Sequence, residues 1–320
     1  MTKEENLFHQ LVTKKIFILI LIIGTIPLFP QTARTRTATE KYPDGTIKQV
    51  ENYNENLRDG ESRYYYPTGI LKEIVNYKNG KKEGVSKEYY ESGILKESLN
   101  YKDNILNGIY STYLPAGVIK EKGKYNNGRF DDTIKTFYEN GNINSLYWYK
   151  NGLREGLAKE YYDNEVLKVE TNYMHDSQNG KATWYYENGN VKGTYDYVDG
   201  NMQGPAKEYY PDGKLKADKN FNYSQLNGII KIYYENGKIK SESNYKNGER
   251  EGMTKSYYEN GSLWSEQNYH ENLLEDDTKI YRDTGSLWYI ESYKDGNLVK
   301  SREYSEDGKL ISEKNMSTIE

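Results

Sequence analysis

The sequence contains no cysteine, which excludes disulfide bonds, thiolate metal sites, cysteine nucleophiles and lipid-modified cysteines. Histidine is scarce as well, because the chain has only His9, His175 and His270. No block of basic residues is present: 44 Lys and Arg are interspersed with 48 Asp and Glu, for a formal net charge of −4. We therefore expect neither a nucleic-acid partner nor a cofactor.

Aliphatic side chains are also few. Hydrophobic residues make up 35% of the 320 positions, and that share includes 35 tyrosines. A chain so poor in aliphatics is often disordered, but disordered chains are depleted in aromatics too. Abundant tyrosine together with 28 glycines instead predicts many short strands joined by tight turns.

One long apolar run lies near the N-terminus, where Lys14 and Lys15 precede residues 16–29. Its length fits the core of a signal peptide better than a spanning helix, which needs about 20 residues. Ala33 is the best cleavage position, but Gln31 stands where a small residue is preferred, so an uncleaved anchor stays open. We assign residues 1–33 to a hydrophobic helix, either signal peptide or membrane anchor. The protein is expected to be exported to the periplasm or cell envelope, secreted, or tethered to the inner membrane.

The rest of the chain is periodic, with a repeat of 24 residues. Glu165 fills one slot of a ladder of turn glycines: Gly45, Gly69, Gly93, Gly117, Gly141, Gly189, Gly213, Gly237, Gly261 and Gly285. An aromatic ladder has the same period: Tyr53, Tyr77, Tyr101, Tyr125, Tyr149, Tyr173, Tyr197, Phe221, Tyr245, Tyr269 and Tyr293. A last turn glycine, Gly308, brings the turns to 12 and defines an array over residues 41–311, between a linker at 34–40 and a disordered tail at 312–320.

Residues 229–246 illustrate one unit, in which Asn236-Gly237 separates two β-prone runs. Asn-Gly is typical of a two-residue hairpin turn, whose central residues both need positive φ. The segment 247–250 then reads as a four-residue connection to the next hairpin. This register places Tyr234 opposite Ile239, and Tyr245 opposite Gly252.

The same register gives the two faces of the sheet different characters. One face carries the ladder tyrosines, each lying over a glycine of a second ladder. The other face carries alternating charges, in the order Lys231, Glu242, Lys255, Glu266 and Lys279. Cross-strand pairs of this kind each contribute roughly 0.2–1 kcal/mol.

The unit Tyr-Tyr-x-x-Gly-x-Ile/Leu-Lys-x-x-x-x-Tyr-x-x-Gly-x-x-x-Gly resembles the MORN repeat in its bacterial variant form. The resemblance implies an all-β fold: an elongated, single-layer antiparallel sheet of about 12 tandem hairpins. Family members mostly act in protein interaction or scaffolding, lipid binding has been proposed for some, and bacterial examples include the YwqK-like antitoxins. The pattern is broken at three glycine positions, which suggests local irregularity; the residues there are Glu165, Asp132 and Asp276.

The best candidate for a partner-binding surface is aromatic. Trp264 and Trp288 occupy the slot that is lysine in most repeats, and the inferred register places Tyr257 and Tyr281 opposite them. Exposed aromatic clusters are enriched at binding hot spots. The alternative is that these four rings cap the C-terminal end of the sheet.

No catalytic motif is evident. Asp131-Asp132, the acidic run at 275–277 and the histidines of the connections are interpreted as solvated surface groups, because no metal-site spacing is present. The leading hypothesis is a non-enzymatic exported scaffold that binds a protein partner. An antitoxin, a glycan- or lipid-binding protein and an envelope hydrolase are the alternatives, and the exposed end strands also suggest end-to-end self-association.

Replacing both tryptophans, Trp264→Ala with Trp288→Ala, is expected to abolish partner capture because it removes the exposed rings. The β signal in circular dichroism should persist in this variant. A variant that keeps both capture and β signal, or loses both, would show that the rings are not a binding site.

Overall fold

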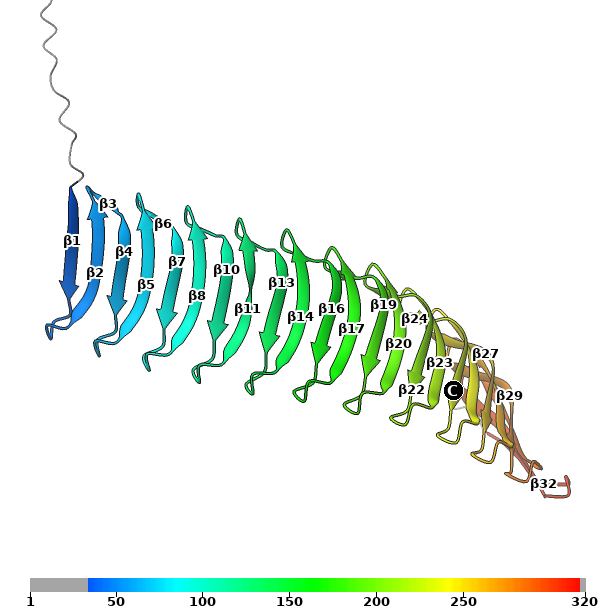
Figure 1. Cartoon of the computed structure of the whole chain (residues 1–320). Coiled ribbons are helices and arrows are strands. Elements are labelled where there is room, and N and C mark those ends of the chain that lie inside the picture. The colour runs from blue at the N-terminus through cyan, green and yellow to red at the C-terminus, as the bar shows by residue number, and fades with distance from the viewer. Residues whose placement is uncertain (1–33, 317–320) are drawn as a thin grey trace, which may run out of the picture.

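The computed structural model describes residues 34–316, which form twelve hairpins in one open antiparallel sheet (Figure 1). The outgoing strands are β1(Thr35–Lys41), β4(Gly60–Tyr65), β7(Gly84–Tyr89), β10(Gly108–Tyr113), β13(Asp132–Phe137), β16(Gly156–Tyr161), β19(Gly180–Tyr185), β22(Gly204–Tyr209), β25(Gly228–Tyr233), β27(Glu249–Tyr257), β29(Leu273–Tyr281) and β31(Asn297–Tyr304). The returning strands are β2(Ile47–Asn54), β5(Leu71–Lys78), β8(Leu95–Lys102), β11(Ile119–Asn126), β14(Ile143–Lys150), β17(Leu167–Met174), β20(Val191–Val198), β23(Leu215–Asn222), β26(Ile239–Lys246), β28(Leu263–His270), β30(Leu287–Lys294) and β32(Leu310–Asn315). Short strands in the connections are β3(Leu57–Arg58), β6(Lys81–Lys82), β9(Ile105–Leu106), β12(Arg129–Phe130), β15(Leu153–Arg154), β18(Ser177–Gln178), β21(Asn201–Met202) and β24(Gln225–Leu226).

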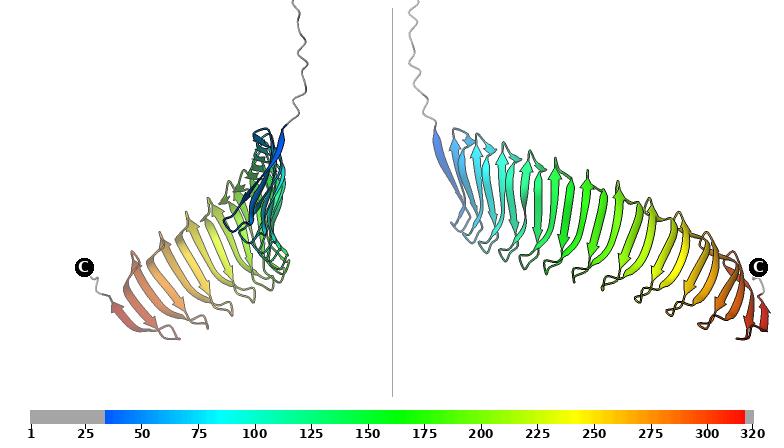
Figure 2. Two further views of the ribbon diagram at one scale, coloured as in Figure 1. Left: turned by 90° about the vertical axis from the view of Figure 1, so that its left-hand side faces the viewer. Right: turned by 45° about the vertical axis from the view of Figure 1, so that its right-hand side comes forward.

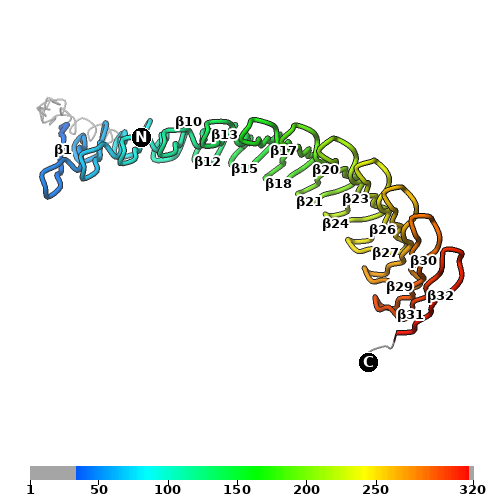
Figure 3. The backbone as a smooth tube through the Cα atoms, turned by 90° about the horizontal axis from the view of Figure 1, so that it is seen from below, coloured from blue at the N-terminus to red at the C-terminus, as the bar shows by residue number. Residues whose placement is uncertain are grey.

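The described chain is a single layer, as the repeat predicted. The sheet twists along its length, so that strands seen edge-on near the N-terminal end are fanned out near the C-terminal end (Figure 2). Seen along the strands, the hairpins follow an arc (Figure 3). The predicted N-terminal helix falls outside the described residues.

Both predicted boundaries of the array are wrong. Residues 34–40 are not a linker, because β1 forms the first outgoing strand and pairs with β2 from Thr35 to Lys41. Part of the predicted tail is also a strand, since β32 pairs with β31 up to Asn315. The two edge strands lack the glycine and tyrosine markers of the repeat, but their backbones still complete the hydrogen-bonded ladder of a neighbour.

The turns differ from the prediction. At the hairpin tip, Gly237 N–H donates to Tyr234 O and Tyr234 N–H donates to Lys238 O, each at 2.9 Å, so the loop has three residues. Only Gly237 has positive φ there (84°), while the Oδ1 atom of Asn236 accepts a bond from the N–H of Lys238. This geometry is a type I turn followed by a left-handed residue, the usual three-residue hairpin.

The two-residue turn lies instead in the connection between hairpins. Asn247 and Gly248 have φ of 52° and 87°, and Lys246 pairs with Glu249 across them. Tyr245 therefore lies opposite Arg250 on one side and Gly228 on the other, and not opposite Gly252. A Cβ at Gly228 would meet nothing within 4 Å. Glycine is therefore favoured at this position by its positive φ of 88°, and not by a need to make room for the tyrosine ring.

The charged face has the predicted register, and we call it the lysine face. Lys231, Glu242, Lys255, Glu266 and Lys279 lie opposite one another in that order across successive strands. The Nζ of Lys231 lies 2.7 Å from Oε1 of Glu242, and the Lys255–Glu266 pair is 3.2 Å apart. Partial exposure keeps each of these pairs weak.

The opposite side, the tyrosine face, is where burial occurs. A row at 24-residue spacing is buried along its centre: Ser62, Ser86, Tyr110, Ile134, Ala158, Ala182, Ala206, Ile230, Thr254 and Thr278. Beside it, ladder rings interleave with side chains from the connections. The Phe130 ring lies 4.7 Å from that of Tyr125 and 5.3 Å from that of Tyr149, and the Arg154 guanidinium lies 4.3 Å from the Tyr173 ring. These stacked side chains replace a second layer.

A second tyrosine ladder holds the hairpin tips together. In each pair the hydroxyl of one turn tyrosine donates to a backbone carbonyl 23 residues later, with distances between 2.6 and 2.9 Å: Tyr42 to Tyr65, Tyr66 to Tyr89, Tyr90 to Tyr113, Tyr138 to Tyr161, Tyr162 to Tyr185, Tyr186 to Tyr209, Tyr210 to Tyr233, Tyr234 to Tyr257, and Tyr258 to Tyr281. Each carbonyl belongs to a residue at a β-bulge, where the register shifts, as between Ile232 and Tyr233. The hydroxyl thus satisfies a backbone acceptor at a place where the regular ladder is interrupted.

Removing one of these hydroxyls, as in Tyr210→Phe, is expected to lower the free energy of unfolding by about 0.5–1.5 kcal/mol, because the carbonyl of Tyr233 loses its donor. Stability in a repeat array is largely local, so faster amide hydrogen exchange should be confined to β22, β23 and β25. Tyr223→Phe is the matched control, since Tyr223 is 73% exposed. Equal effects of the two substitutions would contradict the role given to the turn tyrosines.

Candidate binding site

The tyrosine face is hollowed between β19 and β23. The hollow has a volume of about 460 Å³ and is lined by Trp184, Lys192, Gly193, Tyr195, Tyr197, Met202, Glu208, Lys219 and Phe221. Four aromatic rings, one thioether and one acid–base pair therefore surround a single concavity. Mostly apolar walls with a few convergent polar groups are the usual composition of a ligand site.

Gly193 creates the room for this hollow. It lies between Trp184 and Glu208, which pair with it from the two neighbouring strands. A Cβ at Gly193 would stand 2.9 Å from Cε2 of Tyr195 and 3.2 Å from the carbonyl oxygen of Lys207. The Tyr195 ring therefore lies directly over the glycine, and any larger residue would push it outward.

The polar groups of the hollow are already joined. Glu208 accepts hydrogen bonds from the Tyr195 hydroxyl at 2.9 Å and from Nζ of Lys219 at 2.6 Å. Burial acts to raise the pKa of Glu208, but these two bonds outweigh it and hold the pKa below its usual value. Burial and the same carboxylate raise the pKa of Tyr195. The Glu208 carboxylate is therefore held in place and ionised at neutral pH.

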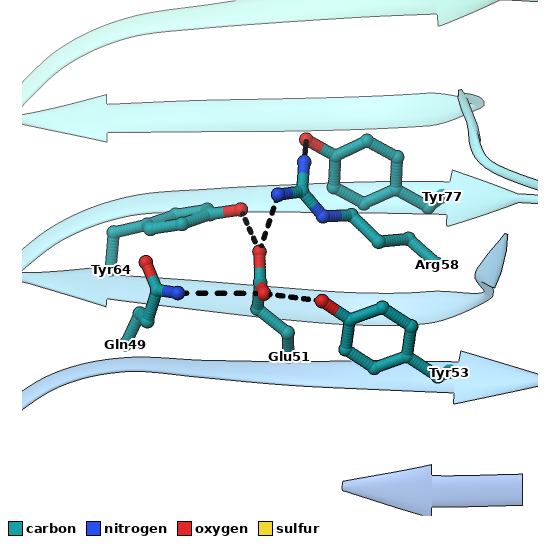
Figure 4. A network of polar contacts seen from close by, with 6 residues as sticks. All are labelled: Gln49, Glu51, Tyr53, Arg58, Tyr64 and Tyr77. Atoms are coloured by element: carbon teal, nitrogen blue, oxygen red, sulfur yellow. Dashed lines mark hydrogen bonds and ion pairs between the residues drawn. The ribbon is translucent and has the colours of Figure 1, made fainter. Parts of the chain in front are cut away.

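A related network near the N-terminal end is covered by an arginine side chain (Figure 4). Glu51 accepts hydrogen bonds from the hydroxyls of Tyr53 (2.7 Å) and Tyr64 (2.8 Å), and the Arg58 guanidinium lies 2.9 Å away. The Arg58 guanidinium also contacts the Tyr77 ring, and Glu51 is only 4% exposed. Here the arginine fills the space above the carboxylate, so the network stabilises the sheet and leaves no room for a ligand.

The structure separates the residues of the predicted aromatic surface. Tyr257 lies opposite Leu263 and Tyr281 opposite Leu287, so neither tyrosine faces a tryptophan. The prediction of this pairing is wrong because a β-bulge adds one residue to the returning strand. Trp264 packs instead at 6.3 Å from the Tyr258 ring.

Trp288 has equivalent surroundings, 5.0 Å from the Tyr289 ring and 5.2 Å from the guanidinium of Arg282. In other repeats a lysine fills this slot, as Lys240 does 5.6 Å from the Tyr234 ring. Trp264 and Trp288 are 46% and 38% exposed, so both remain accessible. Their role in binding stays a prediction.

Several acidic residues of the connections accept hydrogen bonds from backbone N–H groups, and His270 lies beside an acidic residue. His270 Nδ1 lies 3.2 Å from Glu251, Asp132 accepts a bond from the N–H of Thr133, and Glu275 accepts one from the N–H of Asp295. Across residues 34–316, no group of three or more His, Asp or Glu side chains is arranged to hold a metal ion. Over the same residues, no helix is long and apolar enough to cross a membrane.

Sequence reasoning missed the hollow. Its signal was present, because Gly193, Trp184 and Tyr195 all lie outside the two periodic ladders. The hollow combines these three residues with Tyr197 and Phe221 of the aromatic ladder, and periodicity drew attention only to the positions that recur.

Comparison with known proteins identifies the repeat. The family model described as MORN repeat variant matches eight segments that together cover more than half of the chain, at residues 58–79, 82–103, 106–127, 154–175, 178–199, 202–223, 226–247 and 250–271. The unmatched residues 128–153 contain Asp132 and form the same hairpin as their neighbours. No curated protein matches the chain.

Two solved structures align with most of this chain. The crystal structure of TcdB2-TccC3-Cdc42 is 12% identical, with 88% of this chain and 17% of that chain covered and a TM-score of 0.19. The Photorhabdus luminescens Tc holotoxin pore with mutation TccC3-D651A is 13% identical, with coverage of 88% and 18% and a TM-score of 0.18. This chain therefore spans less than a fifth of the length of either, and TM-scores this low support no conclusion about function.

The Glu208 network is expected to make stability depend on pH. Because the folded-state pKa of Glu208 lies below its unfolded value of about 4.3, its contribution is present above that value and is lost as the pH falls through the folded pKa. Glu208→Gln should therefore destabilise the chain by about 1–2 kcal/mol at pH 7, with the difference from the native chain shrinking toward about pH 3. Urea unfolding at several pH values measures this. Glu187→Gln, at an exposed turn, should leave the profile unchanged, and a constant difference for Glu208→Gln would contradict the assignment.

Proposed function

The chain belongs to the MORN repeat variant family, and from this premise we propose that it is a non-enzymatic scaffold that binds a protein partner. The observation that carries the proposal is the aromatic hollow on the tyrosine face, lined by Trp184, Tyr195, Tyr197 and Phe221. Tryptophan and tyrosine in a preformed pocket are the usual anchors of a protein interface. A volume of about 460 Å³ fits one or two side chains of a partner.

The polar groups of the hollow suit recognition better than catalysis. Glu208 is engaged by both Tyr195 and Lys219, so its carboxylate is not free to act as a base. A fixed charged pair inside aromatic walls instead gives orientation to a polar group of the partner. Its hydrogen bonds are already satisfied, so the Glu208 carboxylate is not left unpaired in the free protein.

The site of action proposed for this scaffold is outside the cytoplasm. Support comes from the sequence, where Lys14 and Lys15 precede the apolar residues 16–29. A toxin that the chain neutralises and a glycan of the cell envelope are the other occupants to be separated by experiment. Aromatic rings stack on sugars as well as on side chains, so the test must offer both.

The proposal is tested by affinity capture with the immobilised chain, followed by a glycan array with the same preparations. Trp184→Ala should weaken capture of a protein partner by about 30-fold or more, which corresponds to a hot spot of about 2 kcal/mol. Tyr223→Ala is the control, because Tyr223 is exposed and outside the hollow. Both variants should keep the β signal in circular dichroism.

Capture that is indifferent to Trp184→Ala would exclude the hollow as the protein-binding site. Retention on a glycan that depends on Trp184, with no protein captured, would replace the proposed partner by a carbohydrate. A captured toxin whose activity is suppressed by the native chain alone would assign the antitoxin role.

A further inference from the structure

The lysine face is unevenly charged along its length. Its two central rows contain Arg63, Lys87, Lys122, Lys124, Lys135 and Lys159 between β4 and β16, and no acidic residue occurs in these rows between Glu61 and Glu170. From Glu170 onward the same rows alternate in sign, as in the Lys231–Glu242 pair. The N-terminal half of these two rows is therefore cationic, although the whole chain has a net charge of −4.

Three of these lysines surround a hollow of about 410 Å³. It is lined by Ile109, Lys122, Gly123, Lys124, Asp132, Thr133 and Lys135. Lys122 lies opposite Lys135 on the next strand, and Lys124 lies opposite Ile109. Like charges placed directly opposite each other destabilise a sheet. The positions that correspond to Lys122 in the other returning strands are all acidic or uncharged.

In the part of the chain that the structure describes, these lysines have no ion-pair partner. Among residues 34–316, Lys122, Lys124 and Lys135 form no ion pair and no side-chain hydrogen bond, and Nζ of Lys122 lies 5.3 Å from the centre of the Phe137 ring. The carboxylate of Asp132, at the edge of the hollow, accepts a bond from the N–H of Thr133. The three ammonium groups are thus free to meet an anion from outside.

Large apolar side chains accompany the charges. Ile109 is 73% exposed, Leu157 46% and Trp148 39%, and Thr133 lies opposite Trp148 on the adjoining strand. Neighbouring exposed apolar groups of this size mark interaction surfaces. The ligand that matches this surface carries carboxylates and apolar groups at once.

The surface is defined by Ile109, Lys122, Lys124, Lys135 and Trp148. We infer that this surface is a second binding site for a segment of a protein partner that carries both acidic and leucine-like side chains. It rests on the proposed function in that the partner is a protein, but it lies on the opposite face from the Trp184 hollow. A nucleic acid fits less well, because it needs a continuous basic track and offers no apolar side chains. A lipid surface fits less well, because the ammonium groups surround a hollow and do not form a protruding plane.

The test uses the full chain and a short fluorescein-labelled peptide of glutamate and leucine, with binding followed by fluorescence anisotropy. The double variant Lys122→Gln with Lys135→Gln should raise the Kd at least tenfold. The matched double variant Lys231→Gln with Lys255→Gln, on the same face but beside glutamates, should change it less than twofold. Binding should also weaken between low salt and about 0.15 M salt, since exposed charges are screened.

Several outcomes would overturn the inference: equal binding by both double variants, equal binding of a peptide with lysine in place of glutamate, or tighter binding of duplex DNA or anionic phospholipid vesicles than of the acidic peptide. Trp184→Ala separates the two sites. It should leave peptide binding unchanged, so loss of partner capture in that variant tests the proposed function, while loss of peptide binding in Lys122→Gln with Lys135→Gln tests this surface.

Discussion

The stacking of ladder rings between side chains of the connections is the contact on which the rest of the structure depends. A single-layer sheet has no facing layer against which to bury apolar groups, yet the centre of the tyrosine face is buried. Rings such as Tyr125 and Tyr149 achieve this by packing on Phe130, and Tyr173 by packing on Arg154. Aromatic and guanidinium groups supply the contact area that leucine and isoleucine supply in a two-layer domain.

This packing explains why the repeat length hardly varies. Ladder rings contact side chains of the adjoining connections, as Tyr173 does with Arg154, and each turn tyrosine reaches a carbonyl 23 residues ahead, as Tyr210 does at Tyr233. An added residue would displace both contacts together. At one break in the pattern, Arg282 takes the place of a turn tyrosine: it donates to the carbonyl of Tyr304 and lies beside Trp288, which itself takes the place of a lysine.

A repetitive scaffold makes departures from the repeat informative. The acid–tyrosine networks at Glu51 and Glu208 use the same chemistry on the same face, but Arg58 covers one and Gly193 opens the other. On the lysine face, Lys122 lies beside Lys135 in a row where Glu242 and Glu266 balance lysines in later repeats. Binding sites on this sheet are therefore expected where a ladder changes its residue type, because identical repeats present identical surfaces.

By itself the sequence determined the strand-rich class, the 24-residue hairpin unit and the charge register from Lys231 to Lys279, while the single layer followed from the family resemblance. The repeat period and the alternation of side chains between the two faces are local properties, so they can be read directly from the order of residues along the chain. Only the tertiary structure decided which Asn-Gly forms the two-residue turn, because Asn236-Gly237 and Asn247-Gly248 are identical dipeptides distinguished by the bulges beside them. It also decided that β1 and β32 belong to the sheet, that Trp264 faces Tyr258, and that a hollow opens over Gly193. Each of these depends on contacts between neighbouring strands, which the order of residues along one strand does not record.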